Sequence, residues 1–63
     1  MSANHEIIHE LLREIEDLDY ELRLMIARGE HDTHSTEFDA LLEIRYAKRQ
    51  MAERMAERML AHA

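Results

Sequence analysis

Two histidines near the start of the chain have the spacing of a metal site. Residues 5–9 read His-Glu-Ile-Ile-His, the H-E-x-x-H pattern. On a helix this pattern places two imidazoles on one face to bind zinc, while the glutamate acts as a base. A zinc protease also needs a third ligand and a substrate cleft, and a two-helix chain has no sheet from which to build that cleft. We therefore predict no enzymatic activity and no catalytic residues.

A simpler metal site is an alternative. If the chain folds back on itself, His62 returns toward the end that carries His5 and His9. Three imidazoles suit zinc or another divalent cation. The competing interpretation is that these are surface histidines at helix ends. We expect no cofactor, and a metal-binding helical bundle that uses these three residues is the alternative function.

The apolar residues around this motif belong to a longer helical pattern. They follow one another at alternating spacings of three and four, which is typical of a coiled-coil face and predicts a helix over about residues 5–28. The residues of this face are Ile8, Leu11, Ile15, Leu18, Leu22 and Met25. Such a face needs a partner helix. Gly29 is expected to end the helix, because glycine adopts positive φ at little cost.

A polar connection over residues 29–36 leads to a second predicted helix over about 37–61. If the connection makes the two helices antiparallel, residues whose numbers sum to roughly 65 lie side by side. The basic middle of the second helix then meets the acidic middle of the first. We predict ion pairs that fix the register of the hairpin, although these charges are alternatively just solvated. The residues are Asp17, Asp19, Arg45, Lys48 and Arg49.

One short repeat stands out in the second helix. Residues 51–59 read Met-Ala-Glu-Arg twice and close on a third Met. A spacing of four forms a ridge along a helix, and the alanines beside it allow another helix to approach closely. Methionine makes such a ridge adaptable. The ridge is either ordinary core against the first helix or a docking surface for another protein.

Part of the first helix resembles a known enzyme family. Residues 15–22, Ile-Glu-Asp-Leu-Asp-Tyr-Glu-Leu, resemble the first helix of the all-helical chorismate mutases, I-D-x-I-D-x-x-L. That family places an arginine three residues before the isoleucine and another fourteen residues after it. Here those positions hold Leu12 and Gly29. The resemblance therefore carries no site residues over to this chain.

Size and composition indicate one all-α domain over residues 1–63. The chain has no Pro, one Gly, and 46% apolar residues. A single two-helix layer buries little apolar surface, and no cysteine is present to add a disulfide. We therefore predict an antiparallel two-helix hairpin that dimerises into a four-helix bundle or docks on a larger protein.

The net charge of the chain limits the kinds of partner that it is expected to bind. The net charge is −6, which disfavours nucleic acid and anionic membranes. The longest apolar run is residues 24–27, so we expect no membrane span and a cytoplasmic location. The predicted function is a small acidic, non-enzymatic protein–protein interaction module: a regulator, adaptor or inhibitor. Its predicted interface consists of Ile8, Leu11, Ile15, Leu18, Leu22, Met25, Met51, Ala52, Met55, Ala56 and Met59.

Overall fold

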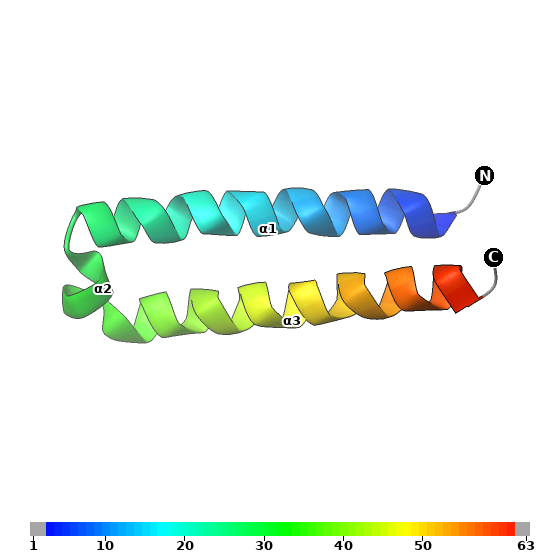
Figure 1. Cartoon of the computed structure of the whole chain (residues 1–63). Helices are drawn as coiled ribbons and strands as arrows, with labels where there is room; N and C mark the ends of the chain where they lie inside the picture. Colours follow the sequence, from blue (N-terminus) through cyan, green and yellow to red (C-terminus); the bar gives the residue numbers. More distant parts are fainter. Residues whose placement is uncertain (1–2, 62–63) are drawn as a thin grey trace.

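The protein folds into two long helices joined by a short one. A computed structural model of the chain describes residues 3–61. It contains α1 (Ala3–Ala27), α2 (Glu30–Thr33) and α3 (Ser35–Ala61), and the described residues form no strand. α1 and α3 run side by side in opposite directions, with α2 at the closed end of the hairpin (Figure 1). The expected all-α fold is therefore confirmed.

The helix bounds differ from the predicted ones by a few residues. α1 begins two residues before residue 5 and ends one residue before residue 28, and α3 begins two residues before residue 37. The connection is also not irregular, because residues 30–33 form the short helix α2. The backbone amide of Phe38 donates to the carbonyl of His34 at 2.9 Å, so the first turn of α3 includes polar residues that we had placed in the connection.

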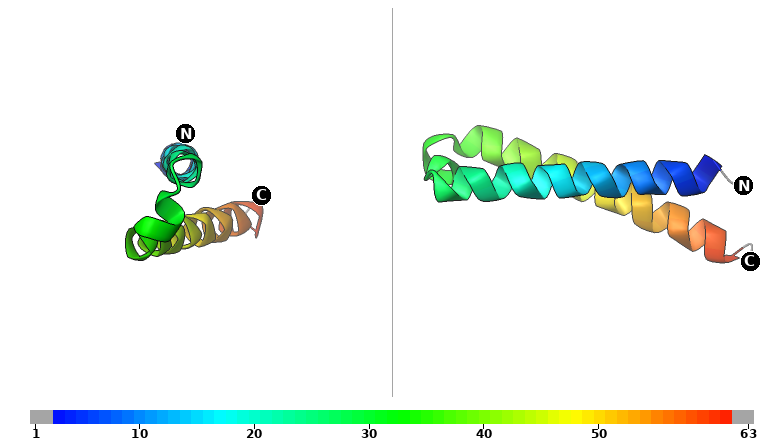
Figure 2. Two further views of the ribbon diagram at one scale, coloured as in Figure 1. Left: turned by 90° about the vertical axis from the view of Figure 1, so that its left-hand side faces the viewer. Right: turned by 90° about the horizontal axis from the view of Figure 1, so that it is seen from above.

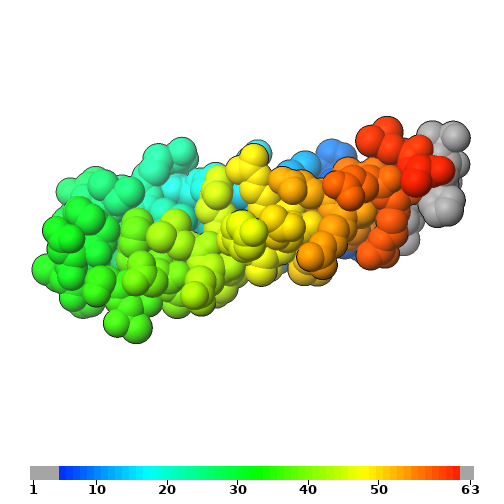
Figure 3. Space-filling view, turned by 60° about the horizontal axis from the view of Figure 1, so that its bottom comes forward, coloured from blue at the N-terminus to red at the C-terminus, as the bar shows by residue number. Residues whose placement is uncertain are grey.

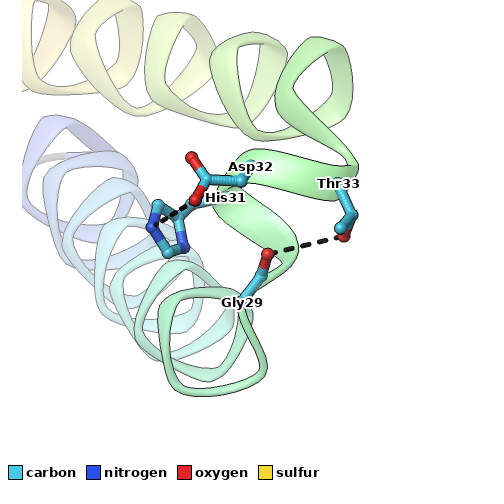
Figure 4. A network of polar contacts seen from close by, with 4 residues as sticks. All are labelled: Gly29, His31, Asp32 and Thr33. Carbon is cyan, nitrogen blue, oxygen red and sulfur yellow. Dashed lines mark hydrogen bonds and ion pairs between the residues drawn. The ribbon is translucent and has the colours of Figure 1, made fainter.

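Gly29 ends α1 in the way that the sequence predicts. Its φ is 73° and its ψ is 11°, the left-handed conformation that side chains disfavour. Its amide donates to the Ile26 carbonyl at 3.0 Å, and its own carbonyl accepts from Thr33 Oγ1 at 3.4 Å (Figure 4). The chain can therefore leave α1 and enter α2 within two residues.

His31 anchors the short helix to the start of α3. Its ring packs edge to face against Phe38, with the ring centroids 6.2 Å apart. Its Nε2 lies 3.6 Å from Asp32 Oδ2, as Figure 4 shows. His31 is thus a packing residue of the turn, in agreement with its expected place in the connection.

The two long helices meet along one inner face each. On α1 the most buried side chains are Leu11, Ile15, Leu22 and Met25, each no more than 8% exposed. On α3 the least exposed positions again follow spacings of three and four. Apart from Gln50, which lies off this pattern, they are Phe38, Leu41, Arg45, Lys48, Ala52, Met55 and Met59. Because two of these seven are charged and one is alanine, α3 supplies far less apolar packing than α1.

The hairpin is long and thin. It measures 46 × 15 × 12 Å. Figure 2 shows that α3 crosses α1 at a shallow angle, and Figure 3 shows α3 lying along α1 over most of its length. No helix in the described part of the chain is long and apolar enough to cross a membrane.

Candidate functional site

An open groove runs between α1 and α3 in the half of the hairpin away from α2. It has two parts, which share Ile8 and Ala56 and are therefore continuous. The apolar groove, as we call it below, is formed by Ile8, Leu12, Ile15, Ala52, Ala56, Met59 and Leu60. It exists because alanines stand on α3 where larger side chains would fill the space beside α1.

Large apolar side chains border this groove and remain in contact with solvent. Leu12 is 47% exposed and Leu60 is 77% exposed. No large side chain in the described chain is fully buried, and Ala52 is the only buried residue of α3. The hairpin therefore has an incomplete core. Side chains that complete this core would have to enter the groove.

The total surface area leads to the same conclusion. The chain exposes 5163 Å² for a mass of 7.5 kDa. A compact monomer of this mass exposes about 4,200 Å², so the hairpin shows about 900 Å² more than expected. This surplus is close to the area of about 800 Å² that one partner buries in a standard protein interface.

Charged residues line the groove toward α2. Arg45 Nε donates to Asp19 Oδ1, and both side chains are about one-third exposed. Arg49 Nε lies 3.6 Å from Glu53 Oε1, one turn further along α3, and both of these side chains are more than half exposed. All four residues line the groove. The groove therefore carries charges of both signs from its α2 end to its middle and is apolar toward its open end, apart from His5.

A second ion pair between the helices lies outside the groove. Lys48 Nζ donates to Glu14 Oε1 at 3.1 Å. The side chain of Lys48 is 29% exposed and that of Glu14 is 48% exposed. Neither residue lines the groove, because the pair is on the other flank of the inner face. The two inter-helix ion pairs thus lie on opposite flanks of the inner face, near the middle of the hairpin.

The register differs from the one expected from the sequence. The paired residues Asp19 and Arg45 have numbers that sum to 64, and those of Glu14 and Lys48 sum to 62, whereas we expected about 65. Asp17 was expected beside Lys48, but it is exposed and no described residue forms an ion pair with it. Six residues separate Asp17 from Leu11 and five from Leu22, so it points away from the inner face.

The predicted interface residues fall into two groups. Four on α1 and one on α3 are already buried inside the single hairpin, and half-buried residues continue the same faces. The buried residues are Leu11, Ile15, Leu22, Met25 and Ala52. By contrast, Met51 and Ala56 are exposed, and Ala56 lines the apolar groove. The inner face is thus used mainly to hold the hairpin together, and the groove beside it is the surface that a partner can reach.

The structure does not assemble a metal site from the residues that it describes. His5 is exposed at the open end of the groove, and His9 is exposed on α1 beside Glu6, Glu10 and Arg13. The third proposed ligand, His62, lies outside the described residues. Within residues 5–61, no three His, Cys, Asp or Glu side chains are grouped to hold a metal ion.

Leu12 and Leu60 are groove residues that the predicted interface omitted. Both lie beside the three-and-four pattern and not on it, so a search for the inner face passes over them. Leu12 lies seven residues before Asp19, and this spacing places the two on one side of α1. A search along this side of α1 in the sequence would have found Leu12 followed by the charged Asp19.

Comparison of the chain with models of protein families, with curated proteins and with solved structures finds no match.

Proposed function

We propose that this chain is a small, acidic, non-enzymatic protein–protein interaction module that binds its partner through the apolar groove. The single observation that carries this proposal is the solvent-exposed apolar lining of the groove. Leu12 and Leu60 remain exposed although they border a hollow that other helices can fill. Exposed apolar side chains that gather at a hollow are a common feature of binding sites.

The partner is expected to supply helices. The groove lies between α1 and α3 and is bordered by Ala52 and Ala56, whose small side chains allow another helix to approach. Two further helices laid on this face would complete a four-helix bundle. They come either from a second copy of the chain or from a larger protein on which the hairpin docks as an adaptor, regulator or inhibitor.

The charge of the chain supports a protein partner over a nucleic acid. The net charge is −6. Nucleic-acid binding depends on neutralising phosphates with many basic side chains. In the groove, Arg45 lies beside Asp19 and Arg49 lies beside Glu53, so neither arginine presents an uncompensated positive charge.

Photo-crosslinking from the groove tests this proposal. Leu12 is replaced by the photoreactive amino acid benzoylphenylalanine in the full chain, expressed in its source cells. Irradiation is expected to join the chain covalently to a protein, either another copy or a different protein. The matched control places the same amino acid at Arg13, which is exposed and does not line the apolar groove. Absence of a protein adduct from position 12, or equal adducts from both positions, would contradict the proposal.

A further inference from the structure

We propose that the partner in the apolar groove is a second copy of this chain, placed by a two-fold axis that passes beside Leu12 of α1 and the turn of α3 at residues 51–52. This inference rests on the proposed function, because it names the partner that completes the bundle. The axis lies across the hairpin, so each α1 packs antiparallel on the other α1 and each α3 on the other α3. The same surface then serves both copies, as two-fold symmetry requires.

The area of the hairpin suits this partner. The surplus of about 900 Å² over a compact monomer is what one copy has to bury in an interface of standard size. A second copy brings the same surplus, so one association removes both.

The charges in the groove are arranged for self-pairing. Arg49 and Glu53 are one turn apart on α3, both line the groove, and both side chains are more than half exposed. An axis midway between them places each Arg49 opposite Glu53 of the other copy, and the reverse. This axis position thus creates two contacts of complementary charge between the copies. Ala56, which is exposed in the groove three residues after Glu53, lets the two α3 helices approach near this point.

The same axis also pairs the exposed leucines of α3. Leu42 lies nine residues before residue 51 and Leu60 lies nine residues after it. Leu42 is 42% exposed, and it is seven residues before Arg49, hence on the same side of α3. Each Leu60 would therefore meet Leu42 of the other copy. On α1, Leu12 lies at the axis and would meet its own counterpart.

A single introduced thiol tests the position of the axis. The chain has no cysteine, so Leu12→Cys gives one reactive site per copy. Under mild oxidation at micromolar concentration, this variant is expected to form a disulfide-linked dimer, because only residues near a two-fold axis lie close enough to their own counterparts. The matched control is Ile44→Cys. Ile44 is also exposed, but it lies one turn before Lys48 on the other flank of α3. The Ile44→Cys variant should therefore not crosslink, and it should run as a single chain on a denaturing gel both with and without reductant.

Charge reversal tests the pairing across the axis. Arg49→Glu and Glu53→Arg are each expected to weaken dimerisation about tenfold or more, because each brings like charges together twice. Mixing the two variants should restore the dimer as a mixed species, although each chain still carries its own unfavourable pair within α3. Arg54→Glu and Glu57→Arg form the control mixture, since both residues are exposed and neither lines the groove. Sedimentation equilibrium measures all of these.

The outcomes separate this inference from the proposed function. A Leu12→Cys crosslink together with recovery in the mixture supports the second copy in this orientation. A folded monomer, or a dimer that crosslinks through Ile44→Cys in place of Leu12→Cys, overturns it. In either of those cases, photo-crosslinking from position 12 to a different protein would still support the proposed function, with that protein in the groove in place of a second copy. Absence of any protein adduct at that position rejects both proposals.

Discussion

Lys48 donates a hydrogen bond to Glu14 across the hairpin at 3.1 Å, although 34 residues separate the two in the sequence. Lys48 occupies a position on the inner face of α3 that a leucine or isoleucine would normally fill. Its charged group reaches the flank of α1 while its methylene chain covers apolar surface. We therefore expect the pair to contribute more to the specificity of the register than to stability.

Reversing one charge of this pair should weaken the hairpin measurably. Lys48→Glu places two carboxylates together, and we expect the free energy of unfolding to fall by about 1 kcal/mol or less for a pair this exposed. The loss should shrink in high salt because mobile ions screen the repulsion. Urea denaturation followed by circular dichroism, at low and at high ionic strength, measures both effects.

A double-mutant cycle identifies the true partner of Lys48. Combining Lys48→Glu with Glu14→Lys should recover part of the lost stability, since the pair is restored with its signs exchanged. Combining it with Asp17→Lys is the control and should show no coupling beyond general screening, because Asp17 is exposed and points away from the inner face. Coupling to Asp17 and not to Glu14 would show that the register derived from the structure is wrong.

The buried face of α1 should be sensitive to truncation. Leu22 is 6% exposed, so Leu22→Ala is expected to cost about 2 to 5 kcal/mol in the free energy of unfolding. Tyr20→Ala is the control, since Tyr20 is 57% exposed and should change stability little. Thermal melts of both variants suffice for the comparison. Equal melting temperatures for the Leu22→Ala variant and the parent would contradict the packing described here.

Gly29 should tolerate few replacements. A side chain would meet no atom within 4 Å, so the cost of Gly29→Ala comes only from the backbone at a φ of 73°. We expect a loss of about 1 to 2 kcal/mol for alanine and a smaller loss for Gly29→Asn, because asparagine enters the left-handed region more readily. Chemical denaturation tests the order of the three residues at this position. If alanine proved as stable as glycine, the left-handed turn would not be required.

Much of the fold could be predicted because it depends on local patterns. The spacing of apolar residues identified α1, and Gly29 identified its end. α2 was missed because four residues are too few to show a helical period. The start of α3 was placed too late because Ser35 and Thr36 favour caps and turns as well as a first helical turn.

The groove was harder to predict because it depends on the exact register of two helices. A shift of three residues determines whether Lys48 meets Glu14 or Asp17, and sequence spacing alone does not fix that shift. The same shift decides which flank of α1 faces Ala52 and Ala56. The sequence can therefore place Leu12 and Asp19 on one flank of α1, but that this flank borders a groove shows only when both helices are in place.

The central claim is that a second copy of the chain fills the apolar groove and completes the core of the hairpin, and one variant tests this most directly. Leu12 is 47% exposed in the single hairpin, so Leu12→Glu should cost an isolated hairpin little, but in an assembled bundle it would bury a carboxylate. Sedimentation equilibrium across the micromolar range, with thermal melts at the same concentrations, measures the difference. We predict that the parent is a dimer whose melting temperature rises with concentration and that Leu12→Glu is a less stable monomer. A parent chain that sediments as a folded monomer, and that melts at the same temperature as Leu12→Glu at every concentration, would contradict the account.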